Sequence, residues 1–157
     1  MRIKTRSLGE VEATPESFIT LPEGLLGYEE QREFVLVSPT EFAPFRWLLS
    51  FSDPELAFPV LDAHLVSAEY KPQIPTSDRR ALGAAESDLI DLLVLASVDP
   101  STGKLTVNLR APIALSAERR IARQVVLSDG RWTVDHPVSG SGHGQDARKD
   151  RATQKAA

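Results

Sequence analysis

The sequence predicts an all-β domain, mainly antiparallel and barrel-like or sandwich-like, with a short helical excursion near residues 75–88. Apolar residues recur at every second position in most patterned segments, which is the period of a β-strand with one buried face. Gly, Pro and Asp residues that favour turns separate these segments. Long helical patterns do not alternate with the strands, so a parallel α/β sheet is not expected.

The first twelve residues predict a β-hairpin. Apolar and polar residues alternate on both sides of a glycine-containing loop. A three-residue loop ending at Gly9, which tolerates a left-handed backbone, would pair Arg6 with Glu10 and Lys4 with Glu12. Opposite charges would then face each other across the two strands.

Residues 45–51 predict a strand whose aromatic and aliphatic side chains share one face: Phe45, Trp47, Leu49 and Phe51. A turn at residues 52–55 leads into a second strand over residues 56–60. Pro59 has no N–H group for the ladder, so this second strand is expected at a sheet edge or at a bulge.

Residues 105–115 show the clearest alternation, because every odd position is apolar. We expect one long strand that Pro112 interrupts, with Asn108 and Arg110 on the face opposite the apolar row. Before it, residues 89–98 are nearly all apolar, as in a strand covered on both faces.

Three further elements complete the prediction. Strands are expected at residues 121–127 and 131–134, joined by a tight hairpin turn at Asp129-Gly130. A short helix is expected from Thr76 to Leu82, stopped by Gly83, with another possible turn at residues 84–88.

The length of 157 residues suits one domain, which we place at residues 1–138. Residues 139–157 lack large apolar side chains and predict a disordered polar tail. The chain has no cysteine and no apolar run of about 20 residues, and the basic N-terminus precedes no apolar signal segment. A cytoplasmic protein with no membrane contact is therefore expected.

The charge is uneven along the chain. The whole sequence carries 18 basic and 22 acidic residues, and residues 138–157 hold four basic and two acidic ones. The remaining 14 basic and 20 acidic residues give residues 1–137 a net charge of −6. A body of this sign disfavours direct binding of nucleic acid and suits a basic protein partner.

Residues for catalysis are sparse, so we expect neither an enzyme nor a bound cofactor or metal. The three histidines are His64, His136 and His143, and no cysteine or further histidine is placed to complete a metal site around Asp62 and His64. The glycines near residue 24 do not form a phosphate-binding motif.

Six stretches in order resemble the FliW family of flagellar assembly factors. They are Leu21-Pro-Glu-Gly-Leu-Leu-Gly-Tyr28 with Phe34-Val-Leu36, Pro44-Phe-Arg-Trp-Leu-Leu-Ser50, Pro54-Glu-Leu-Ala-Phe-Pro-Val60, Val107-Asn-Leu-Arg-Ala-Pro-Ile113, Gln124-Val-Val-Leu127 and Asp135-His-Pro-Val138. The chain departs from the family pattern at Leu49, where glutamine is usual, at Asp135, where arginine is favoured, and at Ala114, where a β-branched residue is usual.

The resemblance implies a β-barrel-like protein that binds two competing proteins and is a monomer when free. One is flagellin, held in the cytoplasm before export, and the other is CsrA, an RNA-binding repressor of flagellin translation. Sequestering CsrA would relieve that repression. The candidate partner-binding residues are Asn108, Arg110, Pro112, Phe45 and Trp47, although the last two also fit a core. The alternative is a ligand-binding β-barrel of unrelated function with a roomy apolar cavity.

Overall fold

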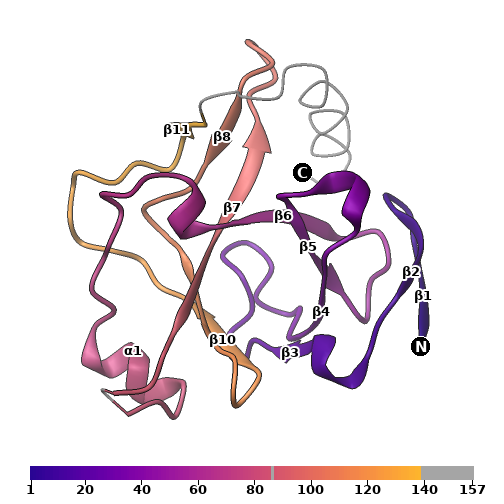
Figure 1. The fold of residues 1–157 in the computed structure, drawn as a ribbon, viewed down its shortest axis with the longest axis horizontal. Helices are drawn as coiled ribbons and strands as arrows, with labels where there is room; N and C mark the ends of the chain where they lie inside the picture. Colours follow the sequence, from indigo (N-terminus) through magenta and orange to yellow (C-terminus); the bar gives the residue numbers. More distant parts are fainter. Residues whose placement is uncertain (86, 139–157) are drawn as a thin grey trace.

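The computed structural model describes residues 1–85 and 87–138, and its main feature is a closed seven-stranded β-barrel (Figure 1). Neighbouring strands are antiparallel except for the β10–β3 pair, and β9 returns to β7 to close the barrel. The expected all-β, mainly antiparallel class is therefore confirmed. In chain order the barrel strands are β3 (Phe18–Thr20), β4 (Glu33–Val37), β5 (Arg46–Ser50), β6 (Ala57–Asp62), β7 (Asp91–Val98), β9 (Ile113–Ser116) and β10 (Ile121–Gln124).

Smaller elements surround the barrel. The hairpin of β1 (Arg2–Thr5) and β2 (Gly9–Glu12) lies at one edge of the molecule, far from the helix α1 (Thr76–Ala81) in Figure 1. The end of β7 pairs with β8 (Leu105–Val107), and β8 pairs with the two-residue β11 (His136–Pro137). Three 3-10 turns complete the fold: η1 (Pro15–Ser17), η2 (Thr40–Phe42) and η3 (Ala63–Leu65).

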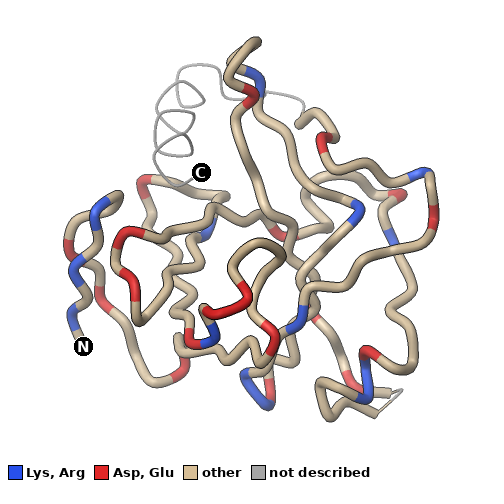
Figure 2. The backbone as a smooth tube through the Cα atoms, turned by 180° about the vertical axis from the view of Figure 1, so that it is seen from behind, with Lys and Arg blue, Asp and Glu red and all other residues tan. Residues whose placement is uncertain are grey.

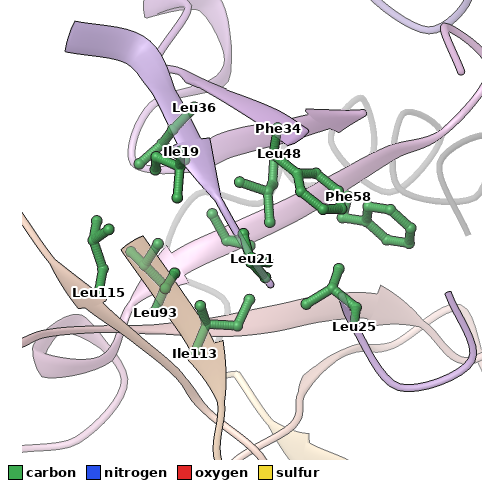
Figure 3. Close-up of a cluster of buried hydrophobic side chains, with 12 residues drawn as sticks. Ile19, Leu21, Leu25, Phe34, Leu36, Leu48, Phe58, Leu93, Ile113 and Leu115 are labelled. Atoms are coloured by element: carbon green, nitrogen blue, oxygen red, sulfur yellow. The ribbon is translucent and has the colours of Figure 1, made fainter. Parts of the chain in front are cut away.

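The barrel interior is filled with apolar side chains. Residues from all seven barrel strands meet in this cluster, and Leu25 reaches into it from the loop between β3 and β4 (Figure 3). Burial of this kind contributes about 25 cal/mol per Å² of apolar surface. The largest side chains of this interior cluster are Ile19, Leu21, Leu25, Phe34, Leu36, Leu48, Phe58, Leu93, Ile113 and Leu115.

Two further clusters lie on the outside of the barrel wall, which explains why several strands are apolar on both faces. The hairpin β1–β2 covers Trp47 and Leu49 through Ile3, Leu8 and Val11. On another side, the segments after β6 and β10 enclose a second cluster: Phe45, Leu61, Tyr70, Leu82, Val94, Val107, Leu109, Val125 and Leu127.

The register of the N-terminal hairpin differs from the expected one by two residues. Glu10 pairs with Lys4, and Glu12 pairs with Arg2, so the loop comprises residues 6–8. The hydroxyl of Thr5 accepts the N–H of Leu8 and donates to the carbonyl of Gly9, both at 2.9 Å, which fixes the loop at residues 6–8.

The expected long strand at residues 105–115 is divided into β8 and β9 by residues 108–112. The expected hairpin between residues 121–127 and 131–134 is also wrong. Residues 121–127 instead run antiparallel to residues 110–116, because the β9–β10 ladder continues through hydrogen bonds from Val125 N to Pro112 O and from Leu127 N to Arg110 O.

The expected edge position of the strand that contains Pro59 is wrong as well, because β6 lies between β5 and β7. Pro59 faces Trp47 of β5, and the ladder with β7 begins one residue later at Val60, so the missing N–H disturbs no pair with β7.

The helix is confirmed at Thr76–Ala81. The predicted tail lies outside the described residues.

Candidate functional site

The segment of residues 108–112 is a five-residue bulge between β8 and β9. Val107 pairs with Ala96 of β7, and Ile113 pairs with Leu93, so five residues span a gap that only Val94 and Leu95 occupy on β7. The bulge redirects the chain from the projecting β7–β8 ladder into the barrel wall. Bulges of this kind are recurrent features beside functional sites.

Asn108 organises the bulge through its side chain. Its Oδ1 atom accepts hydrogen bonds from the backbone N–H groups of Arg110, at 3.1 Å, and Ala111, at 3.0 Å. Its own backbone N–H donates to the carbonyl of Leu95 at 2.9 Å. Asparagine side chains commonly hold turns in this way. Asn108 therefore has a structural role that the alternation of the strand did not indicate.

Neighbouring segments supply further hydrogen bonds to the bulge. The carbonyl of Thr133 accepts the N–H groups of Leu109 and Arg110 at 2.9 and 3.2 Å. The hydroxyl of Tyr70 donates to the carbonyl of Leu109 at 2.6 Å, and Nε2 of Gln124 donates to the carbonyl of Ala111 at 3.1 Å. The bulge is therefore a fixed platform, although it has no regular ladder with β7.

Gln124 also connects the bulge to the loop between β3 and β4. Its Oε1 atom accepts the backbone N–H of Leu26 at 2.8 Å, while its Nε2 atom is bonded to Ala111. Leu25 is buried in the barrel interior, so this loop plugs one end of the barrel. Three segments that are far apart in sequence thus meet around one amide side chain.

The aromatic side of the bulge contains Tyr70 and Trp132. Their rings make an edge-to-face contact with centroids 4.8 Å apart, and the guanidinium of Arg131 lies over the indole ring at 5.1 Å. Burial raises the pKa of Tyr70 above that of a free tyrosine. The phenol therefore stays protonated and keeps its hydrogen bond across the physiological pH range.

The structure separates the five predicted partner-binding residues into two groups. Arg110 is exposed at the surface of the bulge, and Asn108 is half-buried there. Pro112 is buried in the same bulge, whereas Phe45 and Trp47 are buried in the two clusters outside the barrel wall. Only Arg110 combines exposure with a fixed backbone, so it is the strongest candidate of the five.

Basic side chains near this end of the barrel differ in how far they are neutralised. Arg123 pairs with Glu23 and, at 2.7 Å, with Asp78, whereas Arg110 forms no ion pair with any of the described residues. Several acidic positions lie on loops near the centre of Figure 2, which views the molecule from the side opposite to Figure 1. The loop of residues 21–32 between β3 and β4 carries three acidic residues: Glu23, Glu29 and Glu30.

The residues described by the structure contain no group of three or more His, Asp or Glu side chains that could hold a metal ion. His64 lies in η3, and His136 lies in β11, so these two histidines are on separate elements, and His143 is outside the described range. None of the helices within residues 1–85 and 87–138 is long and apolar enough to cross a bilayer.

Comparison with known proteins identifies the family. A family model described as "FliW protein" matches residues 2–138. The flagellar assembly factor FliW of Geobacter sulfurreducens is 37% identical over 137 residues, which are 87% of this chain and 86% of the relative. The chain belongs to the FliW family. The flagellar assembly factor FliW of Thermotoga maritima is 36% identical over 140 residues, which are 88% of this chain and 93% of that relative.

A solved structure of the FliW family shows the same fold. The crystal structure of a flagellar assembly factor FliW superposes on this chain with a TM-score of 0.76, covering 87% of this chain and 96% of that one, at 24% identity. Two of the three residues that depart from the FliW pattern, Leu49 and Ala114, are buried. These two departures therefore change packing, whereas Asp135 is exposed.

Tyr70 and Gln124 are site residues to which the sequence analysis assigned no role. Gln124 opens one of the stretches that resemble FliW and is a polar residue beside an apolar run, which is a signal that could have indicated a structural hydrogen bond. Tyr70 lies outside all six stretches and in no regular strand pattern. Only the folded structure brings it to Leu109.

Proposed function

We propose that this protein is a flagellar assembly factor that binds flagellin in the cytoplasm and sequesters a CsrA-like translational repressor, thereby relieving repression of flagellin translation. The observation that carries the proposal is the convergence of three FliW stretches, residues 21–28, 107–113 and 124–127, at one end of the barrel. Hydrogen bonds join the three stretches to one another, so they form one fixed surface that a protein partner could recognise.

The filled barrel supports protein recognition over the alternative of a ligand-binding barrel. Ligand pockets are concave and commonly several hundred Å³ in volume. Here twelve buried residues occupy the barrel interior, and Leu25 closes one end of it. A small apolar ligand would have to displace this packing to enter.

Charge supports a basic partner. Residues 1–137 carry a net charge of −6, and complementary charge raises the rate of encounter with a basic protein. A protein that binds RNA needs Lys and Arg to neutralise phosphates, so a CsrA-like repressor has suitable chemistry. In this proposal the free protein is a monomer.

The test is a pair of titrations with purified flagellin and purified CsrA-like repressor from the same bacterium. We expect the wild-type protein to bind both, and Arg110→Ala to weaken binding of at least one partner without lowering the melting temperature. Arg2→Ala, an exposed arginine of the N-terminal hairpin, is the matched control. Failure of the wild-type protein to bind either partner would overturn the proposed function, whereas normal binding by Arg110→Ala would place the interface elsewhere.

A further inference from the structure

The loop that plugs the barrel exposes apolar side chains beside a neighbouring strand end. Leu26 is 58% exposed and Tyr28 is 36% exposed in the loop, and Val126 is 59% exposed two residues beyond Gln124. Gln124 accepts the backbone N–H of Leu26, and Val126 follows Gln124 by two residues in the extended segment that continues β10, so the side chains of Gln124 and Val126 share one face of that segment. We name Leu26, Tyr28 and Val126, together with Glu29 and Glu30, the plug surface.

The backbone under the plug surface is held in place. Tyr28 donates its N–H to the carbonyl of Leu25 at 2.8 Å, and Leu25 itself is 1% exposed within the barrel. The ring of Tyr28 makes an edge-to-face contact with Phe58 at 5.0 Å between centroids. A surface fixed in this way loses little conformational entropy when a partner binds.

The plug surface has an acidic border without bound counter-charges. Glu29 and Glu30 are exposed, and neither forms an ion pair within residues 1–85 and 87–138. Glu29 Oε2 accepts the N–H of Gly27 at 3.1 Å, which holds that carboxylate against the loop. Glu23 differs because it is already paired with Arg123. The negative charge at Glu29 and Glu30 is therefore available to a ligand.

We propose that the plug surface is the docking site for a protein segment that carries aliphatic side chains next to Lys or Arg. Apolar side chains of the segment would cover Leu26 and Val126, and its basic groups would face Glu29 and Glu30. This inference rests on the proposed function, and it assigns the surface to the basic partner, the CsrA-like repressor, rather than to flagellin.

Paired variants separate the apolar and charged parts of the proposal. Leu26→Ser combined with Val126→Ser should weaken the affinity for purified CsrA-like repressor by about tenfold or more, as expected for loss of central apolar contacts. Leu65→Ser combined with Leu89→Ser is the control, because both leucines are exposed in other parts of the fold. Glu30→Lys should lower the association rate, and Glu41→Lys in η2 is its control.

Thermal melting of each variant confirms that the fold is intact before titration. Unchanged affinity of the Leu26/Val126 double variant would overturn the proposal, and so would loss of flagellin binding with repressor binding retained. Failure of the wild-type protein to bind the repressor would instead overturn the proposed function. Weaker repressor binding by the plug-surface variants, with normal binding by both controls, is the supporting result.

Discussion

The hydroxyl of Tyr70 donates a 2.6 Å hydrogen bond to the carbonyl oxygen of Leu109, across 39 positions of sequence. The bond is buried, and both residues belong to the cluster outside the barrel wall. It joins the segment after η3 to the bulge that carries Arg110. The geometry of the bulge therefore depends on a side chain that a distant segment supplies.

Replacing Tyr70 by phenylalanine should destabilise the protein by about 1–3 kcal/mol, because the buried carbonyl of Leu109 loses its partner while the ring remains. Urea unfolding at neutral pH measures the change. Tyr28→Phe is the control, since the Tyr28 ring lies at the surface. A free energy of unfolding equal to that of the wild-type protein would show that water or another group replaces the hydroxyl.

The raised pKa of Tyr70 predicts a loss of stability at alkaline pH. Burial raises the pKa in the folded state above the value of about 10 for an unfolded tyrosine, so the unfolded state releases its proton first. The contribution is fully present below pH 10 and declines as the pH rises toward the folded-state pKa. Unfolding free energies measured between pH 8 and 11 should fall less steeply for Tyr70→Phe than for the wild-type protein.

Asn108→Ala should cost about 1–2 kcal/mol, because the N–H groups of Arg110 and Ala111 lose their acceptor. An ordinary surface substitution changes stability by only about 0.5 kcal/mol. Asn108→Asp retains an oxygen acceptor and is the matched variant, with a smaller expected loss. Equal melting temperatures for wild-type and Asn108→Ala would refute the structural role of this side chain.

Gly24 and Gly27 form a matched pair in the loop between β3 and β4, since both have positive φ angles, +66° and +87°. A Cβ atom at Gly24 would lie 2.6 Å from the carbonyl oxygen of Tyr28, whereas a Cβ at Gly27 meets nothing within 4 Å. We expect Gly27→Ala to cost about 1–2 kcal/mol through backbone strain and Gly24→Ala to cost a further ~1–3 kcal/mol through the clash. Chemical denaturation of both variants tests the difference, which should vanish if the loop can move away.

Association with the proposed CsrA-like partner should slow as salt increases, because the Debye length falls from about 10 Å at 0.1 M to about 3 Å at 1 M. The acidic body then no longer attracts a basic partner over distance. Stopped-flow association rates across this range provide the measurement. A rate that is independent of salt would exclude electrostatic steering. The equilibrium affinity is measured separately by the titrations described above.

The sequence pattern predicts the positions of the strands more accurately than it predicts their pairing. Shifting the first hairpin by two residues preserves both faces, so alternation could not distinguish the expected register from the observed one. Asp129-Gly130 suggested a hairpin turn, yet Asp129 accepts the N–H and guanidinium of Arg131 locally. The Asp-Gly pair therefore belongs to a local turn held by Arg131 and does not connect two paired strands.

The candidate site could be predicted only in part, because distant segments supply many of its contacts. The polar positions Asn108 and Arg110 were identified within the alternating segment, and the structure places both in the bulge. The bulge itself depends on Gln124, Tyr70 and Thr133, which approach from distant segments. No periodicity in one strand can reveal hydrogen bonds that three other segments supply.

The parallel contact between β10 and β3 also affects the order of synthesis on the ribosome. Ile121 pairs with Thr20, so the outer edge of β3 has no barrel partner until about a hundred further residues have been translated. An unpaired edge strand can associate with other chains, and contacts of high sequence separation slow folding. Nascent chains that stop before β10 should therefore be substrates for chaperones, and release of the complete chain should be the event that permits the barrel to close.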